Sequence, residues 1–500
     1  MTETLNPAAI ANNGGRARRP GRPDGEPTSL RDWLFRAAIA ALVLTPVVLM
    51  FTLDDRTAIG FAALFLMFIL LFLRMPIAFA LAIPGLIGAF AMLGIRPVAN
   101  LLGAEPLAAS SNWSLSVLPM FILMGLLLAR SGMTSSMYDA ARNWFSWLPG
   151  GLGIGTNMAG AGLAAVSGST IGTTYALARV GVPEMFRAGY KKPIVIGSVI
   201  VAGLPGQLIP PSIFLIIVAG IMENPVGPQL IAGILPGITV AILFSIMIWV
   251  FSLVKPDWAG RGAPGATVTW RDRIVSLVGI WPLIVLMIIV IGGMFMGLLT
   301  ATEAGAAGAA GALIFTLWFK RKDQPLKHIV HAAVETVSAV GAIFLLLVGA
   351  HILTALVVIS GIGRLFSDFV VDSGLGRIEF LLLVMVVYII LGMFMDPLAI
   401  LLTTIPLLLP VLPVLGIDPL WFGVFAVFMG ELAILTPPVG ILTFVIHKLL
   451  QDPAVNLGNR VTVTDVFKAV LLFLPMAILI TILWILVPEI VTFLPGLMGT

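Results

Sequence analysis

The sequence predicts an all-α polytopic membrane protein with about eleven transmembrane spans, two re-entrant helical hairpins and broken helices, arranged as an inverted repeat. Three observations lead to this fold class. The 500 residues are 59% hydrophobic and 10% charged, with a mean hydropathy of +1.09. Basic residues gather in short loops between apolar segments. One pattern of glycines and prolines also occurs twice along the chain.

Composition and charge exclude several other classes. The formal net charge of +4 would suit nucleic-acid binding in a soluble chain, but here the basic residues flank apolar spans, so we expect no nucleic-acid partner. The absence of cysteine excludes disulfides, thiolate nucleophiles and zinc–thiolate sites. The spans contain no Ser/His, HExxH or paired-Asp arrangement, so we expect neither an enzyme nor an organic cofactor.

The amino-terminal part is predicted to be a tail followed by helices. Residues 1–32 are polar and rich in arginine, glycine and proline, which indicates a disordered cytoplasmic tail. Residues 33–56 are expected to form an extra transmembrane helix, because their apolar run is too long for an ordinary signal peptide. Residues 57–130 then supply scaffold helices. Their apolar runs lie near 57–75, 76–95 and 114–130.

Residues 131–222 form a first unit whose apolar sequence is interrupted by glycines, hydroxyls and Pro210-Pro211. In lipid, such open backbone survives only where it is buried in protein or lines a wet cavity. The unit is therefore expected to hold a binding site. Its predicted parts are an amphipathic arm over 133–148, a re-entrant hairpin over 150–182 and a broken helix over 193–221.

The second half of the chain follows the same plan. Residues 223–329 supply further scaffold helices, residues 330–447 form a second unit, and residues 448–500 hold a carboxy-terminal helix. The predicted parts of the second unit are a span near 330–358, an arm, a hairpin near 378–412 and a broken helix near 419–447.

Basic residues set the expected orientation, because cytoplasmic loops of membrane proteins carry the excess of lysine and arginine. With a cytoplasmic amino terminus, 24 of the 28 basic residues lie inside. The four outside are Arg56, Arg96, Arg364 and Arg377. We therefore expect a multi-pass membrane protein with a cytoplasmic amino terminus, surrounded by membrane lipids.

The two units align as an internal repeat. Gly189–Gly197, followed by Pro210-Pro211, matches Gly416–Gly423, followed by Pro437-Pro438, at an offset of about 227 residues. About five crossings separate the copies, and an odd number inverts the second relative to the first. Inverted repeats with interrupted hydrophobic segments at matching positions point to a secondary transporter with its site near the membrane midplane.

Several sequence blocks, taken in order, resemble the large membrane subunit of tripartite ATP-independent periplasmic (TRAP) transporters, nearly from end to end. The blocks are Ser167-Gly168-Ser169, Val182–Met185 with Gly189-Tyr190, Leu208–Ser212, Ala232–Gly237, Thr302-Glu303-Ala304, Gly392–Asp396 and Leu435–Gly440. The resemblance implies an elevator-type transporter that uses sodium as coupling ion and imports an organic acid, such as a C4-dicarboxylate. It also implies two partners, a small membrane subunit and a periplasmic solute-binding protein, and a location in the bacterial inner membrane.

The sequence departs from the family pattern in two places. The family usually begins with sequence like that from Thr57 onward, so the preceding span is extra. Thr173 stands where some relatives carry a carboxylate, which leaves open the charge of the first sodium site. An alternative function is an elevator-type carrier or exporter of organic anions that needs no binding protein. Dicarboxylates, keto acids and sugar acids all remain open as substrates.

Broken helices offer backbone carbonyls and hydroxyls, the oxygen ligands that a hard cation such as sodium prefers. The residues expected at sodium are Ser167, Gly168, Ser169, Thr173, Gly206, Pro210, Asp396, Thr403, Thr436 and Pro437. Amino termini of half-helices and hydroxyls would hold an anionic substrate. The residues expected at the substrate are Thr170, Gln207, Ser212, Thr404, Glu431 and Gly440.

Each of these assignments has a structural alternative. Small residues around Ser167 also allow close helix packing in lipid. Asp396 also suits the cap of a helix that begins at Pro397. For Glu303 a helix-start role is favoured over a binding role, and for His351 a hydrogen-bonded packing role is favoured over a proton relay. Glu431 is open between the two.

Overall fold

The computed structural model describes residues 30–260, 268–437 and 440–498, and every regular element in these ranges is a helix. This confirms the all-α prediction. The predicted tail lies outside the described residues up to residue 29, and helix α1 already begins at Leu30, so the predicted boundary at residue 33 is three residues late. Helix α1 ends at Thr52, and Asp55 caps the next helix, which begins at Arg56, so the extra helix ends before the predicted boundary at residue 56.

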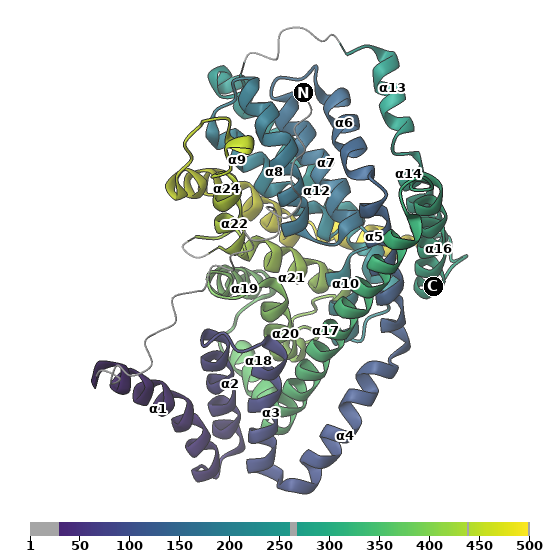
Figure 1. Cartoon of the computed structure of the whole chain (residues 1–500). Helices are drawn as coiled ribbons and strands as arrows, with labels where there is room; N and C mark the ends of the chain where they lie inside the picture. The colour runs from purple at the N-terminus through teal and green to yellow at the C-terminus, as the bar shows by residue number, and fades with distance from the viewer. Residues whose placement is uncertain (1–29, 261–267, 438–439, 499–500) are drawn as a thin grey trace, which may run out of the picture.

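The first scaffold group consists of α1 (Leu30–Thr52), α2 (Arg56–Phe72), α3 (Ile77–Leu93), α4 (Ile95–Ser111) and α5 (Val117–Arg130). Helix α4 was not predicted. Its sequence is only weakly apolar and contains Pro97 and Pro106, which lowered its helical signal. Pro97 is tolerated because it lies in the first turn, where its missing N–H has no helical partner. In Figure 1, α4 runs obliquely at the edge of the molecule.

The first repeat unit comprises arm 1, hairpin 1 and broken helix 1. Their helices are α6 (Met133–Phe145), the pair α7 (Gly151–Ser167) and α8 (Thr170–Arg187), and the pair α9 (Lys192–Val201) and α10 (Ile213–Ile221). The second repeat unit comprises arm 2, hairpin 2 and broken helix 2. Their helices are α18 (Ile362–Asp372), the pair α19 (Arg377–Gly392) and α20 (Pro397–Leu408), and the pair α21 (Pro419–Ala433) and α22 (Ile441–Leu449).

The remaining helices surround these units. They are α11 (Val226–Ala232), α12 (Ile234–Val254), α13 (Trp270–Val278), α14 (Trp281–Met287), α15 (Gly293–Phe295), α16 (Ala301–Phe319), α17 (Pro325–Ser360), α23 (Pro453–Asn456), α24 (Val463–Leu486) and α25 (Glu489–Leu497). Helix α5, which precedes arm 1, packs on α16, and α17, which precedes arm 2, packs on α3. The helix before each arm therefore has an equivalent neighbour. Arm 1 lies toward the top of Figure 1 and arm 2 in its lower half, as an inverted repeat requires.

Four helices in the described ranges are long and apolar enough to cross a membrane, or five if the bent segment from α13 to α15 counts as one span. The prediction of about eleven spans includes segments that this length criterion leaves out. Hairpin and broken-helix segments such as α9 and α10 have only 10 and 9 residues, because each crosses part of the layer and then turns or breaks. Together they give the multi-pass architecture of the predicted class.

Hairpin 1 packs so closely against broken helix 1 that two glycine positions leave no room for a side chain. A Cβ added at Gly160 would lie 2.3 Å from the Cβ of Ala202, and one added at Gly206 would lie 2.2 Å from the Cβ of Ala164. Such close backbone contact is typical of membrane helices with small residues at their interfaces. It holds the tip of the hairpin beside the break between α9 and α10.

This contact yields a test of the fold. Gly160→Leu is expected to destabilise the protein by about 1–3 kcal/mol, because the inserted side chain forces α7 away from Ala202. Thermal unfolding in detergent, followed by size-exclusion fluorescence, measures the effect. Gly227→Ala is the control, since nothing lies within 4 Å of an added Cβ there. Equal melting temperatures for the two variants would contradict this packing.

Candidate functional site

The tip of hairpin 1 is a tight turn between two helices. Helix α7 ends at Ser167, and Gly168 follows with φ +61°, a left-handed conformation that glycine adopts without a Cβ penalty. Ser169 then caps α8, and its side chain accepts a hydrogen bond from the Gly172 N–H at 3.0 Å. The chain therefore reverses within two residues and leaves serine oxygens at the turn.

Three of the predicted sodium ligands come together at this tip. The Ser167 and Thr173 hydroxyl oxygens are 3.1 Å apart, and the Ser167 Oγ lies 3.5 Å from the carbonyl oxygen of Ser169. Thr173 is buried. The cluster carries no formal charge, and no group of three or more His, Asp or Glu side chains in the described ranges is arranged to hold a metal ion. Its chemistry is thus that of neutral oxygen donors.

The break in broken helix 1 forms its own hydrogen-bonded turn. Ser212 caps α10 by accepting from the Leu215 N–H at 3.2 Å, and its hydroxyl donates to the carbonyl oxygen of Gln207. The Gln207 side chain is buried, and its Oε1 has no hydrogen-bond partner in the structure. Pro210 is also buried in this break and is followed by a cis peptide bond. Gln207 and Ser212, both expected at the substrate, thus contact each other.

Gly206, which is expected at sodium, packs closely against hairpin 1. A Cβ added to it would lie 2.2 Å from the Cβ of Ala164 and 2.6 Å from the backbone nitrogen of Ala165, and the residue lines neither of the two cavities at the hairpin tip. The nearest contacts of Gly206 thus lie on the turn of α7 before Ser167. The role that the geometry gives Gly206 is close packing between hairpin 1 and broken helix 1.

Hairpin 2 repeats the pattern with a carboxylate. Asp396 caps α20 by accepting from the Ala399 N–H at 3.1 Å, so the helix-cap alternative describes one of its contacts. Thr403 is fully buried, and its hydroxyl has no partner in the structure. Thr404 instead bonds the Tyr388 hydroxyl at 2.6 Å and the Ile400 carbonyl at 2.7 Å, which joins α19 to α20. Thr404 therefore has a packing role in this arrangement.

The break in broken helix 2 turns several carbonyl groups toward one point. A Cβ added at Gly440 would lie 3.0 Å, 3.1 Å and 3.2 Å from the carbonyl oxygens of Leu435, Thr436 and Ile434. Only glycine leaves this space free. The Thr436 hydroxyl donates to the Leu432 carbonyl at 3.2 Å, and Pro437 is partly buried beside it. Pro438 and Val439 lie outside the described residues.

One hydrogen bond joins the two repeat units at their centre. Thr170, the first residue of α8, donates its hydroxyl to the Glu431 carboxylate of α21 at 2.6 Å. Both side chains are buried. A buried carboxylate is costly without a donor, so this contact fixes the tip of hairpin 1 to broken helix 2. Both residues are expected at the substrate, and the structure shows that they also bond each other.

Two cavities flank the tip of hairpin 1, and Ser167 lines both. One of about 260 Å³ lies between the tip and helices α5 and α17. Another of about 220 Å³ lies toward arm 1 and includes Gly172 and Thr173. Asp396, Thr403 and Thr436 line neither. The tip of hairpin 1 is therefore open to both of these cavities.

Sequence reasoning missed a charged pair beside the first cavity. Arg130, at the end of α5, forms an ion pair with Glu335 of α17, and Glu335 lines the cavity. The signal was present, because Glu335 interrupts an apolar span, and ionisable residues within such spans are costly and often functional. It was not used because Arg130 stands at the edge of its predicted span.

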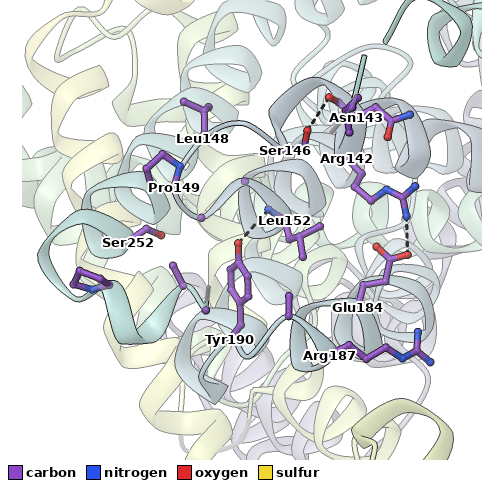
Figure 2. Close-up of a pocket in the computed structure, with 17 residues that line it drawn as sticks. Arg142, Asn143, Ser146, Leu148, Pro149, Leu152, Glu184, Arg187, Tyr190 and Ser252 are labelled. Atoms are coloured by element: carbon purple, nitrogen blue, oxygen red, sulfur yellow. Dashed lines mark hydrogen bonds and ion pairs between the residues drawn. The ribbon is translucent and has the colours of Figure 1, made fainter. Parts of the chain in front are cut away.

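A larger cavity, of about 610 Å³, lies at the base of hairpin 1 and contains none of the predicted site residues. Figure 2 shows Arg142 of arm 1 directed at Glu184 of α8, with 3.0 Å between nitrogen and oxygen. The Tyr190 hydroxyl accepts from the Leu152 N–H at 3.3 Å. Burial raises the pKa of Tyr190 to about 12, which extends the pH range over which the phenol is neutral. The Arg142–Glu184 ion pair attaches the base of hairpin 1 to arm 1, and the Tyr190 hydrogen bond joins the two ends of the hairpin.

Glu303 and His351 have ordinary structural partners. Glu303 and Thr300 form a capping box at the start of α16, with the Thr300 N–H donating to the Glu303 carboxylate at 2.8 Å. The His351 Nδ1 lies 3.3 Å from the Glu105 carboxylate on α4. These hydrogen bonds do not involve residues of the hairpin tips.

A comparison with known families identifies the chain. Residues 64–490 match the family model described as "Tripartite ATP-independent periplasmic transporter, DctM component". The chain belongs to this DctM family. Its relatives are named as transport permeases, so this DctM-family chain is a multi-pass transporter subunit and not an enzyme. The family description, tripartite and periplasmic, makes it one part of a multi-component system.

Several curated relatives are similar over most of their length. A C4-dicarboxylate TRAP transporter large permease of Pseudomonas aeruginosa is 30% identical over 417 residues, covering 83% of this chain and 94% of the relative. The ectoine TRAP transporter large permease of Halomonas elongata is 28% identical over 430 residues, covering 86% and 97%. A sialic acid TRAP transporter permease of Haemophilus influenzae is 27% identical, covering 88% of this chain and 68% of the relative.

A solved structure shares the fold of this DctM-family chain. The Alcanivorax borkumensis YdaH transporter, described as having an unusual topology, superposes with a TM-score of 0.57 at 13% identity. The match covers 79% of this chain and 89% of the other. At this identity the likeness establishes the architecture alone.

The Thr170–Glu431 contact gives a prediction for stability. Thr170→Val is expected to lower stability by about 1–3 kcal/mol, because it removes the donor of a buried carboxylate while keeping the side-chain shape. Thr174→Val, one turn further along the same helix, is the control, since the Thr174 hydroxyl is buried without a partner. Thermal melting of the purified variants measures both. Similar melting temperatures would show that Glu431 does not depend on Thr170.

Proposed function

We propose that this chain is the large permease subunit of a sodium-coupled TRAP transporter that imports an organic acid by an elevator mechanism. The observation that carries the proposal is the tip of hairpin 1. There, hydroxyl and carbonyl oxygens of Ser167, Ser169 and Thr173 gather beside a cavity of about 260 Å³. An oxygen cluster without charge, next to a space for a small molecule, suits the joint binding of a cation and an anion.

Sodium would bind at two sets of oxygens. The first set is the cluster at the tip of hairpin 1. The second set would combine Asp396 with the unpartnered hydroxyl of Thr403 and the carbonyls that face Gly440. Hard cations prefer such oxygen donors, and a single carboxylate supplies charge to only one of the two sites. The sodium affinities of the two sites would then differ in their dependence on ionic strength.

An organic acid would bind between the hairpin tip and the scaffold. The first turn of α8 begins at the tip, and the amino terminus of a helix carries a partial positive charge that favours a carboxylate. Relatives named for C4-dicarboxylate, sialic acid and 2,3-diketo-L-gulonate transport support an organic-acid substrate. The substrate is therefore a C4-dicarboxylate or another carboxylate.

The proposed partners follow from the family. A periplasmic solute-binding protein would deliver the acid, and a small membrane subunit would pack on the scaffold helices. The chain would reside in the bacterial inner membrane with its amino terminus in the cytoplasm, in line with the excess of basic residues in loops on that side. Apolar side chains exposed on α1, including Trp33 and Phe35, would face membrane lipids or the small subunit.

In an elevator mechanism, the two hairpins and broken helices would move as a body along α5 and α17. The Thr170–Glu431 hydrogen bond supports common movement, because it links the two repeat units. The moving and fixed parts approach each other closely at Gly125. A Cβ added at Gly125 of α5 would lie 2.3 Å from the Val166 carbonyl oxygen, so only a glycine lets the tip pass so closely.

Uptake by proteoliposomes tests the function. The chain, its small subunit and its binding protein would be reconstituted, and uptake of labelled succinate, sialic acid and 2,3-diketo-L-gulonate measured under an inward sodium gradient. We expect uptake of one acid that requires both partners and sodium. Efficient uptake without binding protein would favour the alternative of an autonomous carrier or exporter of organic anions. Uptake indifferent to sodium would overturn the coupling.

Asp396→Asn is expected to raise the sodium concentration for half-maximal uptake about ten-fold or more, because the amide keeps the cap but loses the charge. Asp418→Asn is a matched control. Asp418 caps α21 in the same way, with a 3.0 Å bond from the Trp421 N–H and a following proline, but its side chain is exposed. A sodium response that is the same in both variants would remove Asp396 from the sodium site.

The double variant Ser167→Ala with Ser169→Ala is expected to reduce uptake at least ten-fold while assembly and thermal stability stay close to wild type. The hydroxyls bond mainly within the tip, so their loss removes cation ligands more than packing. Ser198→Ala controls for loss of a buried serine, since Ser198 donates to the Ile194 carbonyl within α9. Unfolding of the double variant would instead support the packing alternative.

A further inference from the structure

The cavity beside hairpin 1 has one wall on each of the two parts that would move against each other. Ser167, Ser169 and Pro211 form the wall on the repeat unit. Residues of α5 and α17, including Glu335, form the opposite wall. Glu335 is the one charged residue among those that line this cavity. A lone carboxylate in the wall would repel an organic anion.

Arg130 cancels that charge. Its guanidinium forms an ion pair with the Glu335 carboxylate, across the contact between α5 and α17. Glu335 lines the cavity, whereas Arg130 is not part of the lining and meets the cavity through Glu335. The Arg130 and Glu335 side chains remain 28% and 51% exposed, so the pair is not enclosed by protein. A surface ion pair of this kind contributes little to stability, which gives a reason to seek another role for it.

The chemistry of the pair matches that of the proposed substrate. A guanidinium binds a carboxylate through a planar fork of N–H donors, in a geometry that lysine does not reproduce. Glu335 presents to Arg130 the same group that an organic acid carries. The carboxylate of a ligand in the cavity and the carboxylate of Glu335 are therefore alternative partners for one guanidinium.

We propose that Arg130 binds the carboxylate of the transported acid on the scaffold side of this cavity, and that Glu335 occupies Arg130 when the cavity holds no anion. The acid would pass from the oxygens of the hairpin tip to Arg130, and Glu335 would recover its partner after release. This inference rests on the proposed function, because it takes the substrate to be an organic acid.

Two single variants separate this role from a structural ion pair. Arg130→Gln and Glu335→Gln both break the pair, so a purely structural role predicts the same defect in each. Competition predicts opposite effects. Arg130→Gln removes the substrate ligand and is expected to raise KM about ten-fold, whereas Glu335→Gln removes the competitor and is expected to leave KM unchanged or lower it.

The measurement is counterflow in the reconstituted three-component system, with the internal concentration of the acid varied. The probe is whichever of succinate, sialic acid and 2,3-diketo-L-gulonate the wild type transports. Arg142→Gln and Glu184→Gln serve as controls, because they break an equivalent arginine–glutamate pair at 3.0 Å that lies outside this cavity. Their KM is expected to equal that of the wild type.

Two further variants cover loss of folding. Arg130→Lys keeps the charge and loses the planar fork, so a several-fold rise in KM with unchanged thermal stability is expected. The charge swap Arg130→Glu with Glu335→Arg restores the ion pair, and its melting temperature shows whether the pair matters for folding. An equal rise of KM in Arg130→Gln and Glu335→Gln, or a wild-type KM in Arg130→Gln or Arg130→Lys, would overturn the proposal.

Failure of the proposed function gives a different result. If the wild type transports none of the three acids under a sodium gradient, the organic-acid importer is wrong before any variant is compared. If the wild type transports an acid and the Arg130 and Glu335 variants behave alike, only the role of this pair is wrong. The two outcomes are therefore distinguishable in one set of vesicles.

Discussion

The structure depends on one constraint, which is that backbone opened inside a membrane must find hydrogen-bond partners within the protein. Three of the four interruptions meet this constraint with a short side chain. Ser169 caps α8, Ser212 caps α10 and Asp396 caps α20, so one amino-terminal N–H group of each half-helix is bonded next to its own turn. The fourth, before α22, has Gly440 at the cap position and no side-chain cap. Because the capping side chains are short, the turns stay compact. The oxygens of these side chains lie near the centre of the molecule.

The glycines act together with the caps. Gly160 and Gly206 bring hairpin 1 into backbone contact with broken helix 1, and Gly440 leaves room for three converging carbonyls. A chain that packs this tightly has few ways to rearrange locally, so relative movement is confined to boundaries between rigid parts. In the proposed elevator mechanism, the contact of Gly125 with the carbonyl of Val166 would lie at such a boundary, with a cavity beside it.

Sequence patterns predicted the elements whose signals are local. The glycine and hydroxyl cluster around Ser167 and the repeated proline pairs located both hairpins and both breaks to within a few residues. Helix α4 was missed because two prolines and Glu105 weaken its apolar pattern. Side-chain partnerships that span most of the chain, such as Thr170 with Glu431 or Arg130 with Glu335, leave no local pattern. Spacing alone also does not distinguish a cation ligand from a packing glycine at Gly206.

The hydrogen bond between Thr170 and Glu431 has a mechanical consequence. If hairpin 1 swung open alone, it would strip a buried carboxylate of its donor, which costs about 1–3 kcal/mol or more for a charged group. At the upper end of that range, an independent opening is rarer by more than a hundred-fold. The hydrogen bond therefore couples hairpin 1 to broken helix 2, and a displacement of one repeat unit is expected to displace the other.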